Sequence, residues 1–149
     1  MSTLVEQIND SITSLIATEL GATYSELEYV LDVSQNAFDL TNKKYGVRPL
    51  FANSVEGVTK VYTLDQDFEI ILTDEFVNSG VDDTAQREVA FSLYDKMSEI
   101  FKAIYLTKAG VPSIVLIVNS ITMSEPEYLT DEVAILRAIV RIKYREAIN

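Results

Sequence analysis

An apolar stripe in the second half of the chain predicts a long helix. Its members recur at helical spacing: Ala85, Val89, Leu93, Met97, Ile100, Phe101 and Ile104. Asp82 and Asp83 precede the stripe, where the dipole of a helix favours negative charge, and Gly110 and Pro112 follow it. Such a helix contains about 24 residues and measures roughly 36 Å. We therefore expect a fold in which this helix crosses a whole sheet.

The first residues predict a second, shorter amphipathic helix. Thr3 and Glu6 have the spacing of a capping box, in which side chains satisfy the free amides of a helix start. An apolar side follows at helical period, and Gly21 is a natural stop. The apolar residues are Leu4, Ile8, Ile12, Leu15 and Ile16.

Three strands are predicted between the two helices, because the hydrophobic period changes to two. Residues 26–33 alternate apolar and acidic side chains, and residues 34–45 are read as a polar connection. Residues 47–55 and 58–73 then predict two strands of a hairpin.

The hairpin and the last two strands carry further positional signals. We expect the hairpin to turn at Glu56-Gly57, and Pro49, which has no backbone donor, favours an edge position for the first strand. Ile114–Val118 is continuously apolar, which is typical of a central strand buried on both faces. A loop at residues 124–127 separates it from the last strand, residues 133–145.

These elements predict a single α+β domain over residues 1–149. We expect two main helices packed on an antiparallel or mixed sheet of about four to five strands. The length fits one domain with an adequate core, and no internal repeat is present.

The composition removes most catalytic chemistry. The chain has no histidine and no cysteine, so the commonest general base, disulfides, thiolate metal sites and Cys–His or Ser–His nucleophile pairs are excluded. Its five glycines are isolated, so no glycine-rich phosphate loop exists. Asp65 and Asp67 have the D-x-D spacing of some cation sites, but on a strand both would lie on one solvated face. We expect no catalytic residue, no cofactor, no metal and no enzymatic activity.

The charge and the apolar runs indicate the surroundings of the protein. The 23 acidic residues outnumber the 12 basic ones, and the formal charge is −11, the opposite of the usual sign in nucleic-acid binders. An acidic surface either solubilises a protein or lets it border the path of DNA without binding it. The run Ile114–Val118 is too short to span a bilayer, and the first residues lack the pattern of a signal peptide. We expect no membrane contact and a cytosol-like compartment.

Two charged strand faces are the main positive feature of the sequence. They consist of Asp65, Asp67 and Glu69, and of Arg137, Arg141, Lys143 and Arg145. If the two strands are neighbours in one sheet, the rows form a cross-strand ladder. If they are not, the rows can meet between subunits and fix register there. Ile135 and Ile139 lie among the basic residues, a mixture that is typical of an interface. These seven charged residues are the candidate subunit interface.

Four segments, taken in order, resemble one known family. Residues 44–49 (KYGVRP) lead into the hairpin, which continues with residues 62–68 (YTLDQDF). After the long helix come residues 125–128 (EPEY) and a closing strand that ends in residues 142–145 (IKYR). The series resembles the tail-terminator, or tail-completion, proteins of long-tailed bacteriophages and covers almost the whole chain.

The resemblance implies a structural role in the virion, with the host cytoplasm as the place of synthesis. Proteins of that family form a ring, typically a hexamer, on the head-proximal end of the tail tube, stop its polymerisation and offer a docking surface to the filled head. The implied partners are copies of the chain itself, the tail-tube protein and a head-completion or neck protein, with DNA passing through the lumen without specific binding. Two alternatives stay open: a head-completion or connector protein of the neck, and a monomeric, non-enzymatic binding adaptor.

Overall fold

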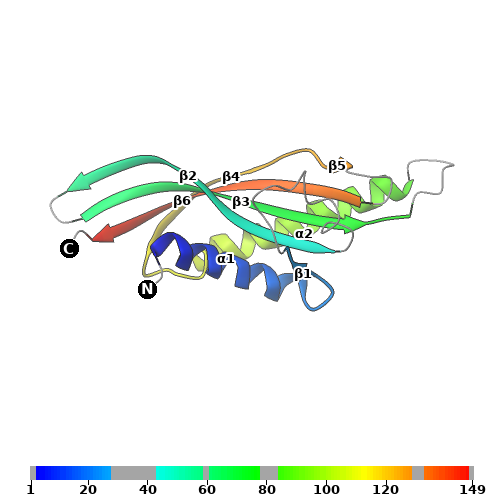
Figure 1. Ribbon diagram of the computed structural model, residues 1–149, viewed down its shortest axis with the longest axis horizontal. Coiled ribbons are helices and arrows are strands. Elements are labelled where there is room, and N and C mark those ends of the chain that lie inside the picture. The colour runs from blue at the N-terminus through cyan, green and yellow to red at the C-terminus, as the bar shows by residue number, and fades with distance from the viewer. Residues whose placement is uncertain (1–2, 28–42, 59–60, 78–83, 129–132, 148–149) are drawn as a thin grey trace.

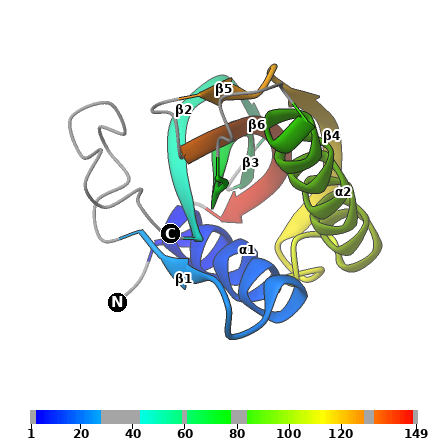
Figure 2. The same ribbon diagram turned by 90° about the vertical axis from the view of Figure 1, so that its right-hand side faces the viewer.

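Two helices and a mixed sheet make up the described part of the protein, a computed structural model covering residues 3–27, 43–58, 61–77, 84–128 and 133–147. The sheet has six strands in these residues, in the order β1-β2-β3-β6-β4, and β5 pairs separately with β6. Both helices lie on one side of it (Figures 1 and 2). The α+β class is confirmed, with more strands than the sequence predicts.

The two predicted helices are present. α1 (Leu4–Leu20) begins at the predicted cap, where the hydroxyl of Thr3 accepts a hydrogen bond of 3.2 Å from the amide of Glu6. α2 (Thr84–Thr107) has 24 residues and crosses the sheet (Figure 1). The predicted aspartates before α2 lie outside the described residues.

The loop after α2 ties the two helices together. The Ser11 hydroxyl of α1 donates a hydrogen bond of 2.6 Å to the carbonyl oxygen of Ala109. Gly110 has a φ of +78°, and a Cβ at this position would collide with the Ser11 hydroxyl. Glycine is therefore required here for its backbone conformation and for its lack of a side chain.

Three strands of 15 residues form the body of the sheet: β2 (Lys44–Val58), β3 (Val61–Glu75) and β6 (Val133–Ala147). β3 pairs antiparallel with β2 on one side and with β6 on the other, and the β3–β6 register runs without a shift along both strands. Shorter strands complete the sheet: β1 (Ser25–Glu26), β4 (Val115–Met123) and β5 (Glu127–Tyr128). β1 pairs in parallel with β2, so the sheet is mixed.

The hairpin of β2 and β3 turns later than the sequence predicts. Glu56-Gly57 lies inside β2, and the pairing continues to Val58 opposite Val61. Glycine is a misleading turn signal here, because the long ladder to β3 outweighs its low strand preference. Among the described residues, β1 pairs only with Lys44 and Tyr45 of β2, so Pro49 lies where β2 forms the edge of the sheet, as expected.

The prediction of a central strand at Ile114–Val118 is wrong. The segment leads into β4, which stands at the end of the strand order beside β6. Val115 and Val118 are buried, whereas Ile117 is 51% exposed. Register shifts at both ends of this run interrupt the alternation of faces, so an apolar sequence here does not require burial on both sides.

Two other predictions are affected. β5 falls in the segment around residues 124–127 that the sequence predicts as a loop. The strand predicted at residues 26–33 is described only at its start, where β1 ends at Glu26. The rest of that strand, and most of the connection predicted at residues 34–45, lie outside the described residues, while Lys44 and Tyr45 belong to β2.

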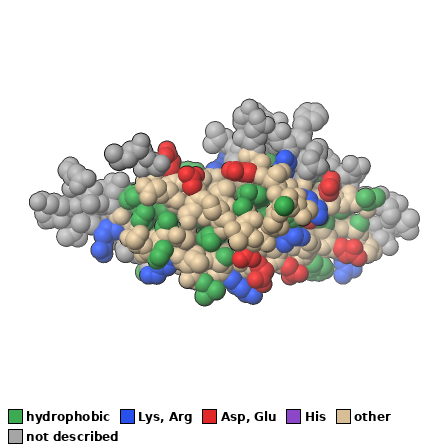
Figure 3. All heavy atoms as spheres, turned by 90° about the horizontal axis from the view of Figure 1, so that it is seen from below, with side chains coloured by type: hydrophobic (Ala, Val, Ile, Leu, Met, Phe, Trp, Pro, Cys, Tyr) green, Lys and Arg blue, Asp and Glu red, His purple; other side chains and the backbone are tan. Residues whose placement is uncertain are grey.

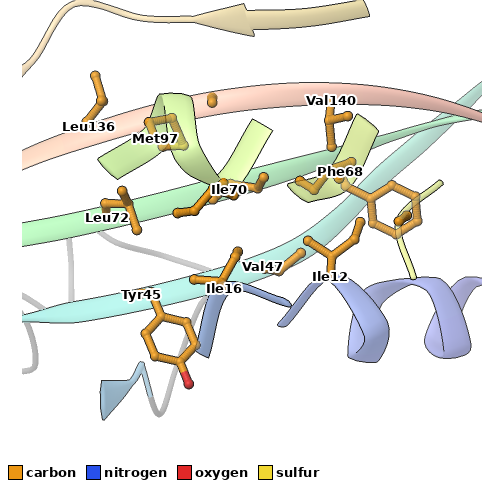
Figure 4. Packing of buried hydrophobic residues seen from close by; sticks show 14 of the residues in the cluster. Ile12, Ile16, Tyr45, Val47, Phe68, Ile70, Leu72, Met97, Leu136 and Val140 are labelled. Carbon is orange, nitrogen blue, oxygen red and sulfur yellow. The ribbon is translucent and has the colours of Figure 1, made fainter. Parts of the chain in front are cut away.

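One apolar core fills the space between the helices and the sheet (Figure 4). α1 contributes Ile8, Ile12 and Ile16, and α2 contributes Val89, Leu93, Met97, Ile100 and Ile104. The sheet meets them with Tyr45, Val47, Phe68, Ile70, Leu72, Leu136 and Val140. On β3 and β6 these are the even-numbered residues, so the odd-numbered side chains point away from the helices.

Candidate interaction surface on the outer face of the sheet

The side of the sheet opposite the helices carries the charged rows that the sequence singles out. We call it the outer face. The residues that define it are Arg48 of β2, Asp65, Asp67 and Glu69 of β3, Ile117 and Asn119 of β4, and Arg137, Ile139, Arg141, Lys143 and Arg145 of β6. Because β3 and β6 are neighbours, the acidic and the basic row lie side by side in one chain.

The centre of the outer face is a ladder of paired charges. Arg141 stands opposite Asp67, and its Nε lies 3.0 Å from the Asp67 Oδ1. This hydrogen bond, together with the negative charge of Asp67, raises the pKa of the Arg141 guanidinium. Arg48 lies opposite Glu69 on the other side of β3, with 2.7 Å between its Nε and the Glu69 Oε1. A ladder within one sheet, the first of the two alternatives, is therefore present at these residues.

Burial of the two carboxylates explains why these ion pairs form. Asp67 and Glu69 are each 7% exposed, and a carboxylate with so little contact to water needs a cation or several donors beside it. Asp65 is more exposed and accepts a hydrogen bond of 2.9 Å from the Asn119 amide of β4. Side chains from three other strands, β2, β4 and β6, thus hold the acidic row in place.

The basic row is only partly used by this ladder. Lys143 stands opposite Asp65 and Arg145 opposite Thr63, whereas Arg137 stands opposite Ile71. The Nε of Arg137 is buried and has no hydrogen-bond partner among the described residues. Of the predicted residues, Arg137 is thus the one that the register does not place opposite an acidic or polar side chain.

Apolar side chains accompany the charges on the outer face. Ile139 is 37% exposed and Ile117 is 51% exposed, and both flank the basic row. Towards β1 the same side of the sheet carries a small buried cluster, formed by Leu27, Ile71, Val133 and Ile135. The mixture of isoleucine and arginine expected from the sequence is therefore partly exposed and partly buried.

Two members of the outer face were not singled out from the sequence, Arg48 and Asn119. Arg48 precedes the edge proline of β2, and its alternation with Val47 places it on the charged side. Asn119 lies in β4, whose register shifts hide its face from a simple alternation. The position of Arg48 on this face could have been found from the alternation of side chains along a strand. The position of Asn119 could be found only once the pairing of β4 with β6 was known.

A second polar cluster lies on the helix side of the sheet, around Asp74. This residue is the last but one of β3 and is 5% exposed. The Tyr24 hydroxyl donates a hydrogen bond of 3.0 Å to its Oδ2, and the amide of Glu75 donates one of 2.9 Å to its Oδ1. The ammonium groups of Lys96 and Lys43 lie 3.8 Å and 4.0 Å from its carboxylate oxygens. Burial, then the charge and hydrogen bond of Asp74, raise the pKa of Tyr24.

This cluster joins separate parts of the fold. Tyr24 follows α1, Asp74 ends β3 and Lys96 lies in α2, and both lysine ammonium groups also lie within 6 Å of the Tyr24 ring centroid. The charged and hydrogen-bonding groups of this cluster contact one another. The arrangement therefore fits a clamp that joins elements of the fold better than a binding site.

No grouping of three or more Asp and Glu side chains with the geometry of a metal site occurs within the described ranges. Asp65 and Asp67, the D-x-D pair, point to one side of β3 and are held by Asn119 and Arg141. None of the described helices is long and apolar enough to cross a membrane. No protein-family model matches the chain, and a search of curated proteins finds no relative.

Proposed function

We propose that the protein is a structural subunit of a phage virion, a tail terminator that assembles as a ring on the head-proximal end of the tail tube. The ring, typically of six copies in the family that the sequence resembles, stops growth of the tube and offers the surface on which the head docks. It is made in the host cytoplasm and ends up in the virion. Its partners are other copies of itself, the tube protein and a neck protein.

The observation that carries this proposal is the outer face. A face that combines ordered ion pairs, an Arg137 Nε without a hydrogen-bond partner among the described residues, and partly exposed isoleucines has the composition of a protein interface. The charge supports the same role. Each copy brings a formal charge of −11, so a ring surrounds its lumen with an excess of negative charge that favours passage of DNA over binding.

Two other functions fit the same features less fully. A head-completion protein of the neck would use the same kind of ring and differ in what it binds. A monomeric adaptor would use the outer face for a single partner of another kind. The resemblance of the sequence to tail terminators favours the first proposal over both.

A tube-length assay tests the function. Added to purified tube subunits and their tail-tip nucleus, the protein should limit tube length without changing the rate of initiation. Particles that lack it should carry tails of irregular length and fail to join heads. Uniform tails together with leaking heads would instead identify a head-completion protein. A protein that stays monomeric in sedimentation, both alone and with tubes, would favour the adaptor.

A further inference from the structure

We infer that two copies of the chain meet head to tail, with the outer face of one copy on the acidic side of α2 of the next. The inference deepens the proposed ring by naming the second surface of the contact. The partner is a second copy, and the argument rests on complementary charge and on exposed apolar side chains on both surfaces.

The outer face brings an excess of positive charge to a strongly acidic protein. With Lys44, Glu75 and Glu127, which the register places on the same side, it carries six cationic and five carboxylate side chains. Two of the carboxylates, Asp67 and Glu69, are engaged by Arg141 and Arg48. Arg137 has a buried Nε without a partner in the described residues, and Ile139 follows it on the same strand face. The Arg137 residue as a whole is only partly buried, so a carboxylate from outside the chain can approach its positive charge.

The opposite surface of the molecule has the complementary pattern. Glu88, Phe91, Asp95 and Glu99 recur every three or four residues along α2, so they share one side of the helix, and all four are exposed. Lys102 lies on the same side and pairs with Glu99 across 3.0 Å, so the carboxylates of Glu88 and Asp95 carry the excess negative charge. Phe91, at 61% exposure, is the apolar member of this acidic side. Figure 3 views the molecule from the helix side and shows carboxylates spread along it, interspersed with basic side chains.

A hollow beside this acidic side gives room for a long basic side chain. Its volume is about 190 Å³, and it lies where the end of α1 meets α2. The lining residues are Glu19, Leu20, Asp95, Lys96 and Glu99. The ammonium group of Lys96 lies 3.8 Å from the Asp74 carboxylate. The three carboxylates and the leucine suit an arginine or lysine, which contacts apolar surface with its stem and acids with its head.

The charges select between the two ways in which copies can meet. An outer face packed on a second outer face would place surplus cations against cations, and two α2 helices would place acids against acids. In a head-to-tail contact, each interface pairs the outer face of one copy with the acidic side of α2 of the next. Such a contact repeats from copy to copy and closes into a ring when its rotation divides the circle.

Disulfide trapping tests the contact, since the natural chain contains no cysteine. Ile139→Cys places one thiol on the outer face, and Phe91→Cys places one on the acidic side of α2. Under mild oxidation at high protein concentration, a mixture of the two variants should give mainly the mixed dimer. Ile139→Cys that cross-links mainly to itself, or a mixture that stays uncross-linked, would overturn the inference.

A charge exchange gives a second readout. Arg137→Glu, and separately the pair Glu88→Lys with Asp95→Lys, should each weaken self-association roughly tenfold or more. Mixing the two proteins should restore it, because each surface then meets its complement. Lys108→Glu, the same charge reversal on a residue outside both surfaces, should change nothing, and the thermal midpoint of every variant shows whether it is folded.

The outcomes separate this inference from the proposed function. A mixed disulfide and restored assembly without any effect on tube length would keep the head-to-tail contact and remove the tail-terminator role. Tube-length control by wild-type protein, together with an Ile139→Cys homodimer, would keep the role and remove the head-to-tail contact. Assembly of the α2 double variant like the wild type would also exclude α2 as the second surface.

Discussion

The two sides of β3 place side chains from one strand in contrasting surroundings. Its even-numbered residues Phe68, Ile70 and Leu72 pack on the helices and are fully buried. Its odd-numbered residues Asp65, Asp67 and Glu69 meet amides and cations from neighbouring strands. The first side holds the domain together through apolar burial, which is not directional, whereas the second relies on placed charges, which specify partners. The comparison predicts that substitutions on the two sides have separable effects on stability and on assembly.

The largest effect is expected on the apolar side. Phe68→Ala should lower the free energy of unfolding by about 3–5 kcal/mol, because it removes a fully buried ring between the helices and the sheet. Ile139→Ala, on the opposite side of the paired strand, is the matched control and should cost less than about 1 kcal/mol. Urea denaturation of both variants measures the difference. Equal losses would contradict the division between the two sides.

A smaller effect is expected from the ladder. Arg141→Glu leaves the buried carboxylate of Asp67 facing a like charge, so the thermal midpoint should fall, though less than in Phe68→Ala. Arg137→Glu, four residues away on the same strand, breaks no described ion pair. It should leave the thermal midpoint nearer to that of the wild type while weakening assembly. Thermal midpoint and sedimentation mass, measured on the same samples, compare the two arginines. The same loss of stability in both variants would show that Arg137 belongs to the ladder.

The clamp around Asp74 predicts a dependence on alkaline pH. Burial and Asp74 raise the pKa of Tyr24 above its usual 10.0 in the folded protein, so the unfolded chain loses this proton first as the pH rises. The contribution of Tyr24 to stability is therefore complete below pH 10 and declines above it. Tyr24→Phe should cost about 1 kcal/mol near neutral pH and should reduce the alkaline loss.

Denaturation curves at roughly pH 8 and pH 11 measure this change. Tyr45, whose pKa is also raised by burial and by Glu26, should keep part of the alkaline loss in the variant. Tyr45→Phe is thus the comparison variant. A wild-type stability that does not fall above pH 10 would contradict the role given to Tyr24.

The smallest effect is expected from divalent cations. Asp65 and Asp67 are engaged by Asn119 and Arg141, so calorimetric titration with Mg²⁺ or Mn²⁺ should show no stoichiometric site of micromolar affinity. Asp65→Asn with Asp67→Asn is the control, and its titration should match that of the wild type. A stoichiometric heat that this variant abolishes would turn the acidic row into a metal site.

The sequence predicted those parts of the fold whose signals are local. The stripes of α1 and α2, and the alternation along β3 and β6, follow from periodicity alone, and they placed the two charged rows on strand faces. The pairing of β3 with β6 does not follow from periodicity, because nearly sixty residues separate the two strands. No local feature of the sequence specifies which strand pairs with which. For the same reason the ladder and the subunit interface could not be distinguished before the structure.

The errors in the prediction have specific physical causes. Gly57 resembles a turn residue but lies in a strand, since backbone pairing with β3 decides its conformation. Ile114–Val118 resembles a buried central strand, but β4 stands last in the strand order, and its register shifts interrupt the alternation of faces. The burial of Asp74 is not evident from the sequence, because the partners that allow it, Tyr24, Lys43 and Lys96, lie far away along the chain.

The central position of β6 in the strand order has a consequence for how the chain is synthesised. β2 and β3 are synthesised early and can pair as a hairpin at once. The second neighbour of β3 is β6, which begins only at Val133. Until then half of the hydrogen-bonding groups of β3 have no strand partner. Folding therefore cannot finish before β6 is made, and it proceeds at the slow pace of distant contacts. Production of the protein should depend on chaperones and temperature more than its final stability suggests.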